Sequence, residues 1–231
     1  MASKLTNLLY GAVLLIAINL CSCTDYNYID GGRANGIHDC TMWEYFHNQT
    51  TDWDSTIIMI EHAGLKSLFD GTGEHKQITF FGITDLCIVR YMFDHNRLLD
   101  NDKKEGIEVK ESDYWHRVTD IPANICKTFL ERLIIPERIM LQDIPEGSRL
   151  LDPDGKKYIE TDGKVIQSLT ERLFTWVYRE DFGGVAKKGA GQLWIARRLS
   201  TAGNCRIAST DIQTTNGVVQ ALGYDFDMTN F

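Results

Sequence analysis

Residues able to act as nucleophiles, bases or metal ligands are spread singly along this chain. The six histidines stand apart, at positions 38, 47, 62, 75, 95 and 116. The sequence has no G-x-S-x-G elbow, no H-E-x-x-H zinc motif and no C-x-x-C pair. The glycines between residues 184 and 191 lack the Gly-Lys-Ser/Thr ending of a phosphate-binding loop, so they indicate a flexible loop. We therefore predict no catalytic residue, no cofactor and no metal site.

One cysteine stands where covalent chemistry is expected. Lys4 is the only charged residue among the first 22, and an apolar run from Leu8 to Leu20 follows it, broken only by Asn19. The run has the length of a signal-peptide core and is shorter than the roughly 20 residues that span a bilayer. We therefore expect residues 1–22 to be a signal peptide.

The end of that run resembles a bacterial lipobox, in which an apolar residue stands three positions before a cysteine and a small residue directly before it. Leu20 and Ser22 occupy these places for Cys23, which fits better than Cys21. The thiolate would take the lipid as a thioether, and several acyl chains would then hold the protein at a membrane. The alternative is an ordinary cleaved signal with two incidental cysteines.

Charge narrows the choice of partners. The 231 residues carry 24 Lys and Arg against 32 Asp and Glu, a net charge of −8, with no basic tract. Contacts with phosphate need clustered Lys and Arg, so we exclude nucleic acid as a partner. The composition is that of a globular protein. We predict a polar tether over residues 23–36 and one domain over residues 37–231.

The elements of this domain begin with helices. Thr41 is placed to cap a helix with Glu44 completing a capping box, and Asp54 or Ser55 is placed to cap the next. Thr84 is expected to cap a third helix with an apolar face of Leu86, Val89 and Phe93. A fourth helix is expected over residues 122–133, with an apolar face formed by Cys126, Phe129, Leu130 and Leu133. The polar residues 96–112 indicate a loop or an edge hairpin.

Strands dominate the second half. Ile78–Phe81 is an early strand candidate, and turn signals at residues 152–155, 162–163 and 216–217 separate later ones. The later candidates are residues 158–159, 165–166, 173–178, 193–196, 205–208 and 218–222. Helices first and strands later indicate an α+β fold rather than alternating βαβ units.

Three stretches, in order, resemble the fasciclin domain family. The first is Thr41–Phe46 followed by Ile60–Leu65, which is similar to the opening helices of the family. The second, Ile78–Asp85, is similar to the first signature box, T-V-F-A-P-T-[ND], with Gly82 and Ile83 in place of Ala and Pro. The third, Ser209–Val219, is close to the second box, D-I-x-x-x-N-G-V-[IV]-H, which Gln220 follows where the family often has His.

This resemblance implies a wedge-shaped β-sandwich with N-terminal helices packed against it. Its motif residues are expected to hold the fold more than a ligand: Phe81, Thr84, Asp85, Asp211, Asn216 and Gly217. Thr84 or Asp85 is expected to accept N–H groups at the following helix start. Asn216 and Gly217 are expected to supply two positive-φ positions of a hairpin turn.

One departure limits what the resemblance implies about partners. Eukaryotic family members bind adhesion receptors partly through a Tyr-His pair, and the matching positions here are Arg132 and Leu133. That receptor activity is therefore not expected in this chain.

These observations predict a non-enzymatic, fasciclin-like lipoprotein of the cell envelope. It would be anchored in a membrane, expected to be the bacterial outer membrane, through Cys23, and would bind a protein or glycan. Whether it faces the cell surface is left open. The alternative is a scaffold or accessory subunit of an outer-membrane nutrient-uptake or surface assembly. A hydrolase acting on envelope polymers ranks below both.

Overall fold

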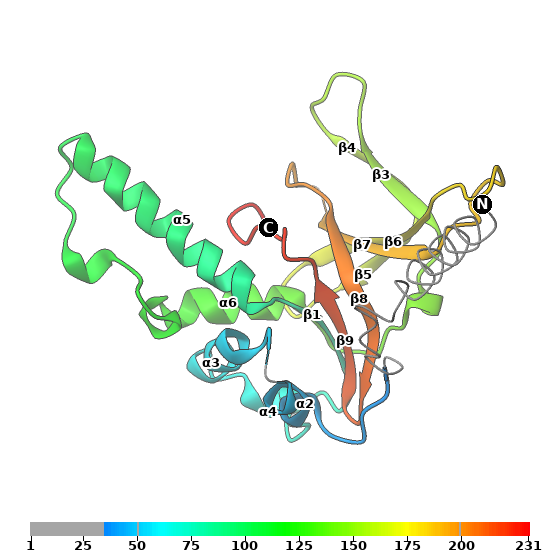
Figure 1. The fold of residues 1–231 in the computed structure, drawn as a ribbon, viewed down its shortest axis with the longest axis horizontal. Coiled ribbons are helices and arrows are strands. Elements are labelled where there is room, and N and C mark those ends of the chain that lie inside the picture. Colours follow the sequence, from blue (N-terminus) through cyan, green and yellow to red (C-terminus); the bar gives the residue numbers. More distant parts are fainter. Residues whose placement is uncertain (1–34, 50, 199) are drawn as a thin grey trace, which may run out of the picture. The chain divides into compact units, whose positions relative to one another are not determined.

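A twisted sheet runs through most of the protein. The computed structural model describes residues 35–231 except 50 and 199, and within them Gly36–Phe231 form one compact unit. In this part of the chain the main sheet has seven strands in the order β2-β1-β9-β8-β7-β6-β5, and a hairpin of β3 and β4 forms a second sheet (Figure 1). The strands are β1 Ile78–Gly82, β2 Ile134–Ile135, β3 Gly147–Leu151, β4 Tyr158–Asp162, β5 Lys164–Gln167, β6 Arg172–Arg179, β7 Gly191–Arg197, β8 Cys205–Thr214 and β9 Gly217–Leu222.

The helices precede most of these strands. They are α2 Met42–Asn48, α3 Asp54–His62, α4 Lys66–Phe69, α5 Asp85–Lys104 and α6 Ala123–Leu133, with short 3-10 turns η1 Glu111–Asp113, η2 Val118–Asp120 and η3 Leu141–Asp143. The α+β class is therefore confirmed. The predicted signal peptide, Cys23 and nearly all of the tether lie outside the described residues, so the domain boundaries stay predictions.

Strand β1 lies inside the main sheet, although it comes early in the chain. It pairs in parallel with β9, with Ile78 opposite Gly217, and antiparallel with β2, with Thr79 opposite Ile135. All five residues of β1 are buried, including both Phe80 and Phe81. A strand that is buried on both faces has no polar alternation, which explains why neither phenylalanine faces solvent.

Aromatic rings join the first helices to this strand. Phe46 of α2 stacks on Trp53 with ring centroids 4.7 Å apart. Phe69 of α4 meets Phe80 of β1 edge to face, with centroids 5.0 Å apart. Such pairs each contribute about 0.5–1.5 kcal/mol beyond the apolar area that they bury. Phe46 also meets Phe80 of β1 edge to face, with centroids 6.1 Å apart, so these rings help to fix α2 and α4 against β1.

Two helices agree with the sequence in detail. Thr41 is the N-cap of α2, its side chain accepts the N–H of Glu44, and the Glu44 carboxylate accepts the N–H of Thr41 at 2.8 Å. The predicted capping box is therefore confirmed. The predicted apolar face of α6 is also confirmed, because its four residues, Cys126, Phe129, Leu130 and Leu133, are all buried.

Helix α5 differs from the prediction in length and orientation. Its buried residues are Cys87 and Ile88, whereas Leu86 is 48% exposed and Phe93 is 67% exposed, so the predicted apolar face does not face the core. The predicted loop over residues 96–112 is also wrong in its first half, because α5 continues to Lys104. No glycine or proline interrupts the sequence before Gly106, which ends the helix with φ +84°. In Figure 1 the far end of α5 points away from the sheet.

A buried arginine connects the β3–β4 hairpin to the loop between β7 and β8. Arg149 of β3 is 1% exposed, and its guanidinium lies 3.7 Å from the ring centroid of Tyr158. Its Nη atoms donate hydrogen bonds to four oxygens on Arg197, Ser200, Ala202 and Asn204. Arg149 therefore holds this loop through hydrogen bonds to oxygens, and it forms no ion pair with a carboxylate of the described residues.

The helices were also compared with the length and hydropathy that a membrane-spanning helix needs. Among the described residues, no helix is both long and apolar enough to cross a bilayer.

Candidate functional site

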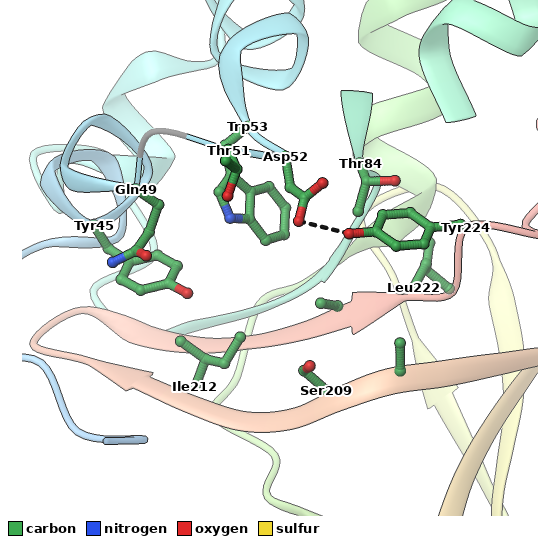
Figure 2. Close-up of a pocket in the computed structure, with 12 residues that line it drawn as sticks. Tyr45, Gln49, Thr51, Asp52, Trp53, Thr84, Ser209, Ile212, Leu222 and Tyr224 are labelled. Atoms are coloured by element: carbon green, nitrogen blue, oxygen red, sulfur yellow. Dashed lines mark hydrogen bonds between the residues drawn. The ribbon is translucent and has the colours of Figure 1, made fainter. Parts of the chain in front are cut away.

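A small pocket opens where three parts of the fold meet. These parts are the connection between α2 and α3, the start of α5, and the hairpin of β8 and β9 (Figure 2). Its volume is about 290 Å³, which lies near the lower end of the roughly 300–1,000 Å³ typical of small-molecule sites. It is lined by Tyr45, Gln49, Thr51, Asp52, Trp53, Thr84, Ala208, Ser209, Ile212, Ala221, Leu222 and Tyr224.

An irregular stretch of β8 forms part of the pocket floor. The pairing with β9 shifts register between Ile207 and Ser209 and again between Ser209 and Ile212. A bulge of this kind redirects side chains, which explains how the consecutive residues Ala208 and Ser209 both line the pocket.

Asp211 and Gln220 hold this irregular stretch in place. Asp211 has a φ of +58°. Its N–H donates to Gln220 Oε1 and its Oδ1 accepts from Gln220 Nε2, both at 2.9 Å. Asp211 Oδ1 also accepts the N–H of Leu141 at 2.8 Å. The second signature box therefore fixes the shape of the strand from outside the pocket.

The opposite side of the pocket is set by the connection before α3. Asp52 has a φ of +76°, and its carbonyl accepts the N–H of Asp85 at 3.0 Å. The Asp85 carboxylate in turn accepts the N–H groups of Ser55 at 2.6 Å and of Asp54 at 3.3 Å. Asp85 therefore caps α3, a helix distant in sequence.

This arrangement corrects two expectations about helix caps. Thr84 is the N-cap residue of α5, but its side chain accepts no capping hydrogen bond and instead lies 3.3 Å from the sulfur of Cys87. Asp85 was expected to cap the helix that follows it, and it caps α3 instead. Neither Asp54 nor Ser55 caps α3, because the helix begins at Asp54 and the N-cap position is Trp53, which makes no side-chain cap.

Aromatic side chains form the inner wall. Trp53 is 5% exposed and Tyr45 is 8% exposed, while Tyr224 on the rim is 53% exposed. The Trp53 ring packs directly over Gly82, where a Cβ would lie 2.7 Å from the indole. The glycine that departs from the family box therefore makes room for this ring. Burial, followed by the negative fields of Cys40 and Asp52, raises the pKa of Tyr45.

One hydrogen bond joins the two sides of the rim. The Tyr224 hydroxyl donates to Asp52 Oδ2 at 2.8 Å (Figure 2). This bond to the carboxylate is the main reason that the pKa of Tyr224 is raised. In the part of the chain that the structure describes, Asp52 Oδ1 accepts no hydrogen bond and Asp52 forms no ion pair. The pocket therefore presents a half-buried carboxylate with one oxygen unoccupied.

Asn216 lies at the end of the hairpin and uses its side chain to hold two helices. Its Oδ1 accepts the N–H of Met42 at 2.7 Å, and its Nδ2 donates to the carbonyl of Phe69 at 2.8 Å. These bonds connect the turn to the start of α2 and the end of α4. Asn216 is 6% exposed, so both bonds are shielded from water.

The predicted hairpin turn is shifted by one residue. Strand pairing closes at Thr214 and Gly217, so the turn residues are Thr215 and Asn216. Of the expected pair, only Gly217 has a positive φ, +155°, and a Cβ there would overlap the carbonyl oxygen of Ile78. The glycine is therefore required by the close approach of β1 rather than by the turn.

Of the six residues expected from the fasciclin-like motifs, one lines the pocket and the others do not. Thr84 lines the pocket, whereas Phe81 is 1% exposed in the core and Asp85, Asp211, Asn216 and Gly217 support the backbone around it. The sequence did not predict Asp52, Trp53 or Tyr224 as pocket residues. No local signal identifies them, because Asp52 and Tyr224 are 172 positions apart.

Arg132 and Leu133, which stand at the positions of the fasciclin family's receptor-binding Tyr-His pair, make contacts within the fold. Arg132 forms an ion pair with Glu171 and donates to the carbonyl of Phe231 at 2.8 Å. Leu133 is fully buried. Both side chains therefore stabilise the fold, Arg132 through polar contacts and Leu133 through packing in the core.

The cysteines and histidines show no catalytic arrangement in the described region. Cys40, Cys87, Cys126 and Cys205 are free thiols there. Burial raises the pKa of Cys126 to about 11 and that of Cys205 to about 12, so both are poor nucleophiles at neutral pH. Among the residues described, no group of three or more His, Cys, Asp or Glu side chains is placed to hold a metal ion.

Comparisons with known proteins find similarity in structure but not in sequence. No protein-family model matches the chain. No curated protein matches it either. Among solved structures it is similar to a FAS1 domain pair from the insect cell adhesion molecule fasciclin I, with a TM-score of 0.48 and 13% identity. That match covers 83% of this chain and 52% of the other, so the chain spans about half the length of that domain pair.

Proposed function

We propose that this chain is a non-enzymatic binding module of the bacterial cell envelope, with the wedge-shaped fasciclin-like fold that its motifs suggest. It would be anchored by lipid on Cys23, expected in the outer membrane, and would bind a protein or glycan through the pocket between Asp52 and Tyr224. The observation that carries the binding proposal is the pocket itself. Aromatic rings, a free carboxylate oxygen and an apolar floor converge there on a space sized for one side chain or one sugar ring.

The burial of the pocket residues supports this proposal. Trp53 and Tyr45 are held by core contacts, and Asp52 is fixed in position by the N–H of Asp85 and the hydroxyl of Tyr224. A site whose groups are already fixed loses little conformational entropy on binding. Its composition, apolar walls with a few placed polar groups, is typical of ligand sites.

The binding proposal is tested with a pocket variant. Purified protein should bind a component of glycan and envelope-protein arrays. Tyr224→Ala should weaken that binding at least tenfold, because it removes the rim ring and releases Asp52. Ile107→Ala, which truncates a 53% exposed side chain distant from the pocket, is the matched control. Equal binding by wild type and Tyr224→Ala would refute the pocket as the binding site.

The anchoring proposal rests on the lipobox alone, because Cys23 lies outside the described residues. Labelling cells with a fatty-acid analogue should mark the wild-type protein and not the Cys23→Ala variant. Cys21→Ala should keep the label and serves as the control. Persistent labelling of Cys23→Ala would refute the anchor. If the label is lost in Cys23→Ala, protease treatment of intact cells shows which membrane face the domain occupies.

One observation favours the alternative, a scaffold or accessory subunit of an outer-membrane assembly. Leu86 and Phe93 of α5 are large, apolar and exposed on one side of a helix that extends from the body of the domain. Exposed apolar surface on a helix is typical of protein interfaces. Co-purification of a stoichiometric membrane partner that is lost with Phe93→Asp would favour this role over the binding module.

A further inference from the structure

We propose that the pocket beside Asp52 receives a lysine side chain from a partner protein, with its ammonium group bound between the Asp52 carboxylate and the Tyr224 ring. This inference rests on the proposed binding function and names the chemistry of the ligand. Three properties of the pocket carry it: its charge, its apolar floor and its size.

The charge of the pocket favours a cation. Among the described residues that line the pocket, Asp52 is the one acidic residue, and none is Lys or Arg. The two tyrosines, Tyr45 and Tyr224, both have raised pKa values and stay neutral. A half-buried carboxylate without an ion-pair partner favours a positive ligand and disfavours an anionic one.

The free oxygen of that carboxylate is fixed for an incoming donor. Oδ2 is occupied by the Tyr224 hydroxyl, and Oδ1 has no partner in the described part of the chain. Aspartate tolerates the left-handed region better than most residues, and the backbone of Asp52 is held there at φ +76° by the bond from the Asp85 N–H to its carbonyl. The carboxylate therefore needs little rearrangement to accept a charged hydrogen bond.

The floor of the pocket suits an aliphatic stem. Ile212 comes from β8, and Ala221 and Leu222 come from β9. Figure 2 shows these strands on one side of the pocket and the Asp52–Tyr224 pair on the other. A lysine can lay its methylene groups on apolar surface while its head reaches a polar group, and an ammonium is also attracted to the face of an aromatic ring.

The size of the pocket suits a single side chain. A space of about 290 Å³ accommodates one side chain and lies just below the range of drug-sized sites. A neutral sugar ring would fit the volume and would donate a hydroxyl to Asp52 Oδ1, but it would leave the charge of the carboxylate without a counter-charge. These properties together favour a lysine side chain over a sugar.

The test uses n-butylammonium, which reproduces the end of a lysine side chain, with the purified protein followed by NMR. We expect binding in about the millimolar range, as is reasonable for so small a probe, with shifts at Trp53 and Tyr224. The neutral analogue of the same chain length, 1-butanol, should bind at least tenfold more weakly, and the affinity for butylammonium should fall as salt is added.

Two variants test the role of the carboxylate. Asp52→Asn removes the charge while keeping the shape, and asparagine tolerates a positive φ, so the fold should persist. It should weaken butylammonium binding at least tenfold. Glu108→Gln makes the same charge change at an exposed loop residue and should leave binding unchanged.

The outcomes separate this inference from the function on which it rests. Tighter binding of the neutral sugar methyl glucoside than of butylammonium would overturn the lysine assignment in favour of a glycan. Unchanged butylammonium binding by Asp52→Asn would overturn it as well. Butylammonium binding that depends on Asp52, combined with array binding that Tyr224→Ala leaves intact, would show a cation site in the pocket but would refute the pocket as the site of partner binding, and with it the partner lysine.

Discussion

Asn216 offers the sharpest test of how this fold is held together. Replacement by alanine removes the acceptor for the Met42 N–H and the donor for the Phe69 carbonyl, bonds of 2.7 and 2.8 Å at a residue that is 6% exposed. A buried polar group left without a partner costs about 1–3 kcal/mol. Two such groups give an expected loss of about 4 kcal/mol in the free energy of unfolding.

Urea denaturation measures this loss. With an m-value of about 3 kcal/mol/M for a domain of this size, Asn216→Ala should lower the urea midpoint by about 1.3 M without changing m. Hydrogen exchange of the Met42 amide should accelerate more than that of amides elsewhere in α2. Asn48→Ala, at an exposed asparagine of the same helix, is the control and should shift the midpoint by less than about 0.2 M.

A small effect would refute the reasoning. If Asn216→Ala lowered the midpoint by no more than Asn48→Ala, the side-chain bonds from the hairpin to α2 and α4 would contribute nothing net. A change in m would show instead that the variant had altered the compactness of the unfolded or native state.

Four further predictions concern buried groups. Gly217→Ala should lower the free energy of unfolding by more than about 1 kcal/mol, because a Cβ would overlap the Ile78 carbonyl; a loss below about 0.5 kcal/mol in urea titration would contradict this. Arg149→Met should accelerate hydrogen exchange in residues 200–204, since four oxygens lose their donor; unchanged exchange would show that Arg149 does not hold the loop between β7 and β8. Cys126 and Cys205, with pKa values of about 11 and 12, should resist iodoacetamide at pH 8 until the protein unfolds. Because these values exceed the ordinary 9.0, the thiols stabilise the fold below pH 9, and this stability should be lost as the pH rises toward 12, measured by thermal unfolding.

What the sequence predicts well is local. The capping box at Thr41 and Glu44 involves residues three positions apart and folds as predicted. The α6 face follows from helical spacing and is buried as expected. In α5 the same spacing identifies a stripe through Leu86 and Phe93 but does not say whether anything covers it, and in the structure the stripe is exposed.

What the sequence does not predict is side-chain pairing across long separations. Asp85 looks like a cap for the helix that follows it, yet its carboxylate bonds to α3, about 30 residues earlier. Asn216 looks like a turn residue, yet its side chain reaches Met42, 174 positions away. The pocket belongs to this second kind, because it exists only when Asp52 and Tyr224 are brought together.

The position of β1 in the sheet has a consequence for biogenesis. Residues 78–82 take their parallel partner from residues 217–222, so the pairing of β1 with β9 waits until nearly the whole chain has emerged. Pairings between strands so distant in sequence slow folding and leave apolar strands exposed in the meantime. A chain that must cross a membrane before folding would carry β1, with Phe80 and Phe81, unpaired throughout its passage. Such a protein would depend on chaperones that hold β1 until β9 arrives, and shortening the chain before residue 217 should turn it into a substrate for proteases.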